Sequence, residues 1–208
     1  MKIAVIAANG RSGQAFVQIA LEAGHLVRAG IHKSSSMKPA KGLTLVDCDA
    51  TQEGDVTRLI QGQDAVVSFI GHVRVSPPDV QTKAIQVIIS SMVNLHQKRL
   101  VSLTGTGVRL PNDKITLFDR LLNVSIGIID PKRVADGKNH AKVLMESDLD
   151  WTIIRVLKLT NRKYRPYSLR ASGPTKLFVS RAEVAQAVLE VLEQKSYIKK
   201  SPIISDPS

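Results

Sequence analysis

The sequence predicts an α/β fold with a doubly wound parallel sheet in a single domain, residues 1–208. Three observations predict it. Short β-branched segments alternate with amphipathic helical segments over about the first 155 residues, which is typical of parallel strands joined by helices. Residues 64–70 are almost continuously apolar, as in a strand that is buried on both faces. The first strand-like segment runs directly into a turn of small residues and then a helix.

The expected elements follow in order. The expected strands are rich in β-branched and aliphatic residues and lie at 2–7, 25–31, 43–46, 64–70, 100–103, 151–156, 178–179 and 203–204. The expected helices carry apolar residues three and four apart and lie at 12–23, 56–59, 80–95, 134–146 and 180–193. Ser180 and Glu183 form the pattern of a capping box. The segment 110–129 is mixed and predicts no regular element.

Composition restricts the class of protein. Hydrophobic residues make up 43% of the chain and charged residues 23%, which is ordinary for a globular domain. No apolar run approaches the roughly 18 residues that span a bilayer, and the N-terminal run is too short for a signal peptide. The single cysteine, Cys48, can form neither an internal disulfide nor a cysteine zinc site. We therefore expect a cytoplasmic protein with no membrane partner.

The net charge of +11 favours anionic ligands. The basic residues are spread along the chain, and aromatic residues make up only 4% of it, so we expect no stacking platform for nucleic acid. The five histidines show no metal-site spacing, and we expect no metal. The charge indicates anionic ligands without identifying one, and a homodimer stays open.

The turn AANGRSG at residues 7–13 is the strongest functional signal. Gly10 allows the backbone to approach a pyrophosphate, and Gly13 allows the helix to pack against the strand. Free N–H groups at the start of the helix bind the anion. The expected phosphate contacts are Asn9, Gly10, Arg11, Ser12 and Gly13. A tight strand–helix turn without a ligand is the alternative.

The end of the second strand bears on the choice of nucleotide. An NAD site usually has an acidic residue there, whereas this chain reads Gly30-Ile31-His32-Lys33. His32, Lys33, the serines at 34–36 and Lys38 suit the 2′-phosphate of NADP(H), so NADP(H) is the preferred cofactor and NAD(H) the alternative. A solvated basic loop would look the same. The other expected cofactor contacts follow later strands and are Asp49, Phe69, Ile70, Gly71 and Thr104.

Several phrases resemble the atypical short-chain dehydrogenase/reductase family, in particular its NmrA-like branch and its flavin reductases of the biliverdin reductase B type. They are AANGRSG, GHLVRAGIH at 24–32, GQDAVVSFIG at 62–71, SLTGTG at 102–107, LMESDLDWTIIR at 144–155 and VSRAEVA at 179–185. The chain departs from the family at Ala7, where glycine is usual, at His32, where arginine is usual, and at Val156, where proline is usual. The resemblance implies a Rossmann-type sheet that binds NAD(P).

The resemblance also bears on the reaction. Many dehydrogenases of this kind use Tyr-x-x-x-Lys, but Tyr164, Tyr167 and Tyr197 are not followed by lysine at that spacing. The likeness to flavin reductases implies hydride transfer to a flavin, quinone or similar planar acceptor, a reaction that depends mainly on positioning. The alternative is a non-catalytic redox sensor of the NmrA-like kind. The missing tyrosine disfavours an isomerase or epimerase.

The segments 105–130 and 157–178 follow strand ends, where open α/β sheets bind ligands, so we expect substrate contacts there. The catalytic candidates are Thr104, His72, Arg155 (with Lys158 beside it) and His140. Each has a structural alternative. Thr104 would cap a turn, His72 would lie on the surface, and Arg155 would pair with Asp130 or Asp136. Asp136 and His140 would form an exposed pair on a helix.

Overall fold

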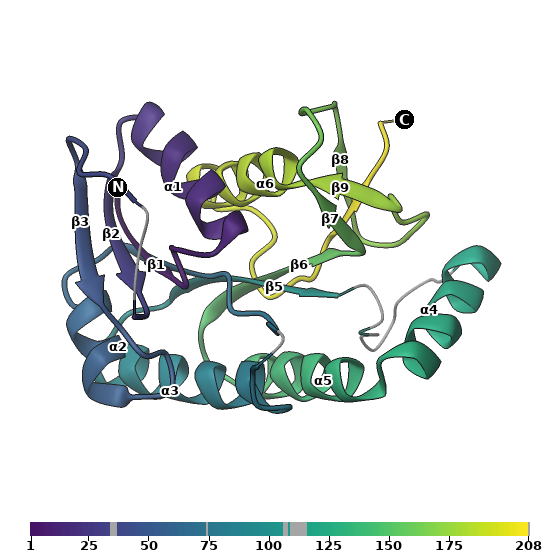
Figure 1. Ribbon diagram of the computed structural model, residues 1–208, viewed down its shortest axis with the longest axis horizontal. Coiled ribbons are helices and arrows are strands. Elements are labelled where there is room, and N and C mark those ends of the chain that lie inside the picture. Colours follow the sequence, from purple (N-terminus) through teal and green to yellow (C-terminus); the bar gives the residue numbers. More distant parts are fainter. Residues whose placement is uncertain (34–36, 74, 106–107, 109–115, 208) are drawn as a thin grey trace.

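In the computed structural model, the described residues are 1–33, 37–73, 75–105, 108 and 116–207. Within them, eight strands form one sheet in the order β3-β2-β1-β4-β5-β6-β10-β8 (Figure 1). The strands of this sheet are β1 (Lys2–Ile6), β2 (Leu26–Ile31), β3 (Leu43–Asp47), β4 (Ala65–Ser68), β5 (Arg99–Gly105), β6 (Asp150–Val156), β8 (Ser168–Arg170) and β10 (Ile203–Ser205). The paired strands are parallel, except that β8 runs antiparallel to β10. The first six strands have the Rossmann order, which confirms the predicted doubly wound sheet.

Helices cover both faces of the sheet (Figure 1). The helices are α1 (Arg11–Glu22), α2 (Glu53–Ile60), α3 (Val80–Asn94), α4 (Leu117–Ile129), α5 (Pro131–Met145) and α6 (Arg181–Glu193). Helices α1 and α6 lie on one face, and α2, α3 and α5 lie on the other. A separate pair of parallel strands, β7 (Lys158–Thr160) and β9 (Phe178–Ser180), leads into α6. Ser180 and Glu183 make the predicted capping box.

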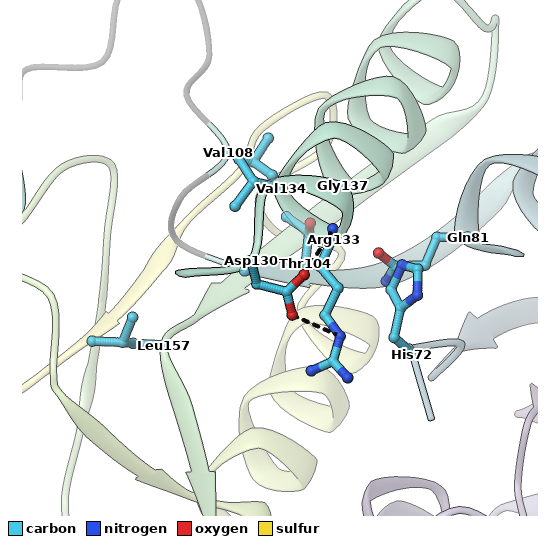
Figure 2. A pocket seen from close by; sticks show the side chains of 10 residues that line it. His72, Gln81, Thr104, Val108, Asp130, Arg133, Val134, Gly137 and Leu157 are labelled. Carbon is cyan, nitrogen blue, oxygen red and sulfur yellow. Dashed lines mark hydrogen bonds and ion pairs between the residues drawn. The ribbon is translucent and has the colours of Figure 1, made fainter. Parts of the chain in front are cut away.

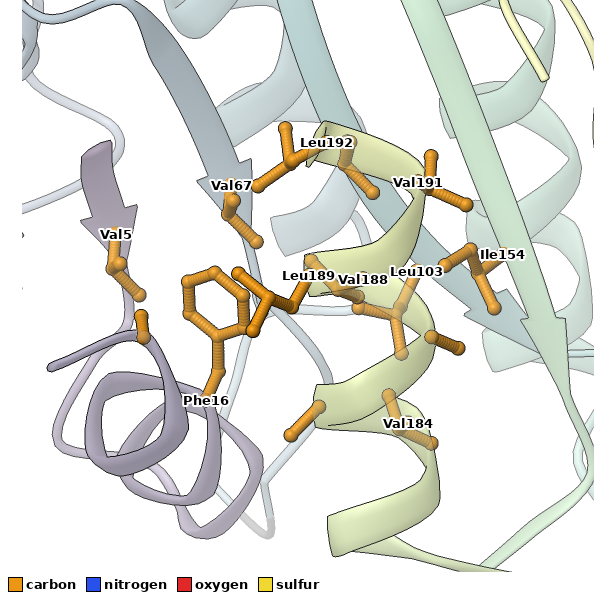
Figure 3. Packing of buried hydrophobic residues seen from close by; sticks show 14 of the residues in the cluster. Val5, Phe16, Val67, Leu103, Ile154, Val184, Val188, Leu189, Val191 and Leu192 are labelled. Carbon is orange, nitrogen blue, oxygen red and sulfur yellow. The ribbon is translucent and has the colours of Figure 1, made fainter. Parts of the chain in front are cut away.

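Side chains of β1 alternate between the two cores. Ile3 and Val5 pack in the cluster under α1 and α6, and Ala4 and Ile6 pack in the cluster under α2, α3 and α5. Figure 3 shows the first cluster, in which Phe16 lies beside residues of α6 and of the sheet. Strands buried on both faces explain the nearly continuous apolar runs in the sequence.

Helix α4 corrects the expectation that 110–129 forms no regular element, because residues 117–129 are helical. Its apolar side chains Leu117, Leu121, Val124 and Ile128 are exposed. The exposed surface of the helix therefore mixes these apolar side chains with polar ones such as Arg120 and Ser125. In Figure 1, α4 extends from the start of α5 away from the sheet. Strands β7 and β8 were also missed; both lie between the predicted strands at 151–156 and 178–179, in a segment expected to be irregular.

Parallel strands bring their carboxyl ends to one edge of the sheet. The register pairs Ile6 of β1 with Ser68 of β4, and Gly105 of β5 with Val156 of β6. The turn at 7–13 and the segments after β4, β5 and β6 therefore meet at this edge, which is where sheets of this kind bind ligands. Among the described residues, no helix has both the length and the apolar character needed to cross a membrane.

Candidate functional site

The turn after β1 has the geometry that a pyrophosphate requires. The backbone N–H of Gly10 donates to the carbonyl oxygen of Ala7 at 3.0 Å. Ala7 itself adopts a left-handed conformation with φ 57°, although glycine is the residue that such a turn favours. Helix α1 begins at Arg11, and because its N-cap residue is Gly10, no side chain caps its first turn. The amides of its first turn have no intrahelical acceptor and are oriented to receive an anion.

Asn9 joins this turn to the end of β2. Its side-chain Nδ2 donates to the carbonyl oxygen of His32 at 3.2 Å. Gln14 of α1 donates through Nε2 to the carbonyl oxygen of Asn9 at 2.9 Å. The phosphate turn and the loop expected to hold the ribose are therefore held together before any ligand binds. This arrangement fits a dinucleotide, whose pyrophosphate and adenosine ribose would contact these two loops.

The residues expected at the 2′-phosphate lie at the open side of this region. His32, Lys33 and Lys38 are exposed, and Lys33 turns the chain at φ 66°. The serines at 34–36, which were expected to assist them, lie outside the described residues. Asp49 accepts hydrogen bonds from the backbone N–H and the hydroxyl of Thr51, which lower the pKa of Asp49. Its carboxylate thus stabilises a turn.

Two adjoining cavities open at the carboxyl edge of the sheet. The larger measures about 370 Å³ and the smaller about 210 Å³. Both are lined by Gln81, Thr104, Gly105 and Leu157. The smaller cavity also contacts Ser12 of the phosphate turn and Phe69, Ile70 and Gly71 after β4. It therefore lies where the nicotinamide of a bound dinucleotide would reach, and the larger cavity lies beside it.

Thr104 stands at the wall that the two cavities share. Its side chain is buried, and its Oγ1 has no hydrogen-bond partner among the described residues. Gly137 of α5 makes room beside it, since a methyl group there would stand 3.1 Å from that Oγ1 and 3.0 Å from Cγ2 of Val108. A buried hydroxyl without a partner is costly, so this atom points to a ligand that bonds it.

His72 contributes to the larger cavity together with a buried acid. Its side chain is only 9% exposed, so the alternative of a surface histidine is wrong. Nε2 of His72 lies 2.9 Å from Oδ2 of Asp136, close enough for an ion pair but without good hydrogen-bond alignment. Figure 2 shows His72 beside Gln81 at this cavity.

His140 lies one turn beyond Asp136 on α5. Both residues are buried, so the expectation of an exposed helix pair is wrong. Nε2 of His140 lies 2.9 Å from the hydroxyl oxygen of Ser102 on β5. Burial lowers the pKa of His140 to about 4, against a smaller opposing effect of Asp136. The ring is therefore neutral at neutral pH, where it links α5 to the sheet.

Arg155 lies beneath the site, with 2% of its surface exposed. It donates to the backbone carbonyl oxygens of Ser201 at 3.0 Å, Ala171 at 3.3 Å and Val108 at 3.4 Å. These bonds indicate that it holds three chain segments together. Lys158 is exposed, and its Nζ lies 5.5 Å from the ring centre of Phe178.

Two of the three tyrosines are bound to groups outside the cavities. The hydroxyl of Tyr167 donates to Glu190 at 2.9 Å, and that of Tyr197 donates to the carbonyl oxygen of Leu169 at 3.0 Å. Burial and the carboxylate of Glu190 raise the pKa of Tyr167. Tyr164 is exposed.

Sequence reasoning missed the contribution of α5 and α3 to the cavity. The α5 contribution to the larger cavity comprises Asp130, Arg133, Val134 and Gly137. These residues are spaced as one helical face, which is a signal that the sequence contains. No pattern in the sequence marks Gln81 of α3 as a cavity residue. Its backbone N–H donates to Asp136, and its Nε2 donates to the carbonyl oxygen of Ile70 at 2.9 Å.

The Rossmann strand order, the uncapped helix at the phosphate turn and the cavities beside it define a nucleotide-binding α/β protein. The profile of the NAD(P)H-binding family matches residues 7–195, and the chain belongs to that family. This confirms the predicted NAD(P)-binding domain and the kind of family suggested by the motifs.

Solved structures show the same fold. A short-chain dehydrogenase/reductase from Veillonella parvula in complex with NADP has a TM-score of 0.81 at 15% identity, over 100% of this chain and 95% of that one. The oxidoreductase ylbE from Lactococcus lactis has a TM-score of 0.81 at 17% identity, over 100% and 92%. A candidate NADH-flavin reductase from Streptococcus pneumoniae has a TM-score of 0.78 at 21% identity, over 100% of both chains.

Proposed function

We propose that this protein is an NAD(P)H-dependent reductase of a flavin, quinone or similar planar acceptor, with NADPH as the preferred cofactor. The observation that carries the proposal is the pair of adjoining cavities. One borders the phosphate turn through Ser12, the other opens beside it, and they share the buried Thr104. Two flat rings held side by side in these adjoining cavities would satisfy the main requirement of hydride transfer.

The bound nicotinamide would supply the hydride, and the residues of this chain would position both rings. The turn at 7–13 would hold the pyrophosphate, and His32, Lys33 and Lys38 would surround the 2′-phosphate. Apolar side chains line the acceptor's cavity, including Val108, Val134 and Leu157. These surfaces suit a flat aromatic acceptor.

The first experiment measures binding of NADPH and NADH to the purified protein by fluorescence, followed by oxidation with FMN, riboflavin and a naphthoquinone in turn. Oxidation that depends on an acceptor supports the reductase and ranks the acceptors. Tight binding without oxidation supports the redox sensor instead. Failure to bind either nucleotide would overturn the proposal.

A charge-removing variant tests the cofactor preference. Replacing Lys33 and Lys38 with alanine should weaken NADPH binding about tenfold, because charge-assisted bonds to the 2′-phosphate are lost. NADH binding should not change. Lys142→Ala on the exposed surface of α5 serves as the matched control. Equal weakening for both nucleotides would contradict a 2′-phosphate site.

A further inference from the structure

We propose that His72, oriented by the buried Asp136, delivers the proton to a carbonyl oxygen of the acceptor. This inference rests on the proposed reductase function and names the acceptor class, a planar molecule with a carbonyl group such as a quinone. It also assigns the proton donor in a chain that lacks Tyr-x-x-x-Lys.

Asp136 is fixed before any ligand binds. Its carboxylate side chain is 1% exposed. It accepts hydrogen bonds from the backbone N–H groups of Gln81 at 2.9 Å and Thr82 at 3.0 Å, and from the Thr82 hydroxyl. These three donors come from the first turn of α3, so they hold the carboxylate between α3 and α5. A buried carboxylate needs such partners.

This fixed carboxylate decides which side of the imidazole faces the ligand. Nε2 of His72 lies 2.9 Å from Oδ2 of Asp136. Nδ1 is therefore the ring nitrogen that remains for a molecule in the larger cavity, which His72 lines. An acidic residue that orients an imidazole in this way is a recurrent device of proton transfer.

The other polar groups of the cavity favour an oxygen as the recipient. The hydroxyl of Thr104 has no partner among the described residues and lines the same cavity. Gln81 uses Nε2 on the carbonyl oxygen of Ile70, which leaves its carbonyl Oε1 for other contacts. His72 and the Thr104 hydroxyl, which can both donate, thus border one cavity, which Val108, Val134 and Leu157 also line together with the paired Asp130 and Arg133. A carbonyl oxygen that becomes negative during reduction would be stabilised there.

The reaction balances with groups already named. The acceptor gains a hydride, with its two electrons, from the reduced nicotinamide, and an electron pair moves onto the carbonyl oxygen of the acceptor. That oxygen forms an O–H bond as the Nδ1–H bond of His72 breaks. His72 is left neutral and regains a proton from water after the reduced acceptor leaves.

Two ion pairs and a further histidine lie on the helices around His72 and Asp136. Arg133 and Asp130 at the start of α5 pair with each other, with Nε to Oδ2 at 3.1 Å. Lys83 and Asp79 pair at 3.0 Å on the exposed side of α3. His140 on α5 has a pKa of about 4 and stays neutral above that pH.

The test compares His72→Asn with His96→Asn, a matched control at an exposed histidine far from the cavity. With a naphthoquinone as the acceptor, His72→Asn should lower kcat about a hundredfold, whereas His96→Asn should leave kcat unchanged. His72→Gln should behave alike, and it provides the same test if the asparagine variant does not fold.

A binding measurement is independent of turnover. A 2-hydroxynaphthoquinone carries a negative oxygen at neutral pH, and calorimetry on the cofactor-free protein should show binding about tenfold weaker in His72→Asn. Unchanged affinity, or an unchanged kcat in both His72 variants, would overturn the role of His72 while the reductase function stands. Absence of NADPH oxidation by the wild type with every acceptor is the separate result that removes the function itself.

Discussion

Gly13 lies so close to Ala7 that a methyl group on Gly13 would stand 2.5 Å from the carbonyl oxygen of Ala7. This contact packs the first turn of α1 directly on the turn that follows β1. The same contact orients the free amides at the start of the helix, where we propose that a pyrophosphate binds.

Gly13→Ala should therefore destabilise the protein by about 1–3 kcal/mol, because the obstructing atoms belong to the backbone and cannot move aside cheaply. NADPH binding should weaken with it. Urea unfolding and fluorescence titration measure the two effects. Gly54→Ala in α2 is the control, because its methyl group would meet only the flexible end of Arg58 at 3.8 Å. An equally stable Gly13→Ala variant would contradict the close packing.

Gly137→Ala should affect the acceptor rather than the fold. Alanine favours a helix over glycine by about 1 kcal/mol, which offsets tight contacts with Val108 and Thr104. The methyl group would enter the larger cavity, and we expect the KM for the acceptor to rise about tenfold, the equivalent of roughly 1.4 kcal/mol. Steady-state kinetics check this against Gly127→Ala in α4, where a methyl group meets nothing within 4 Å. Unchanged kinetics in Gly137→Ala would place the acceptor elsewhere.

Thr104→Val should stabilise the free protein by about 1 kcal/mol, because it removes a buried hydroxyl that has no partner among the described residues. It should also slow turnover, since the same hydroxyl is expected to bond the ligand. Thr152→Val provides the contrast. Its hydroxyl donates to the carbonyl oxygen of Tyr197 and accepts from Arg99, both at 2.8 Å, so its loss should cost about 1–3 kcal/mol. Thermal unfolding of both variants measures whether Thr104→Val raises the stability of the folded protein while Thr152→Val lowers it.

The low pKa of His140 predicts a loss of stability in acid. In the unfolded chain the ring binds a proton below its ordinary pKa of 6.5, whereas in the folded protein it does so only near pH 4. Its stabilising contribution is therefore complete above about pH 6.5 and is lost as the pH falls toward 4, by at most about 3 kcal/mol. Urea unfolding from pH 7 to 4 should show a steeper loss for the wild type than for His140→Gln. Parallel curves would contradict a buried neutral ring.

The elements with strong local patterns could be predicted. The phosphate turn at 7–13 was identifiable because small residues between a strand and a helix have few other uses. The capping box at Ser180 was identifiable because its two partners are three residues apart. Helix α4 was not identified, because its apolar residues do not all face a core, and Leu117, Leu121, Val124 and Ile128 are exposed.

The sequence by itself determined the parallel sheet, the turn between β1 and α1 and the NAD(P)H-binding family, since each depends on neighbouring residues. Only the tertiary structure decided what lines the cavities beside this turn. Gln81 and Asp136 are 55 residues apart and meet because α3 and α5 pack together. Packing also buried Arg155 among backbone carbonyl groups and made His140 neutral. Burial and partners that are distant in sequence determine the chemistry of these side chains. A local sequence pattern predicts neither the burial nor the partners.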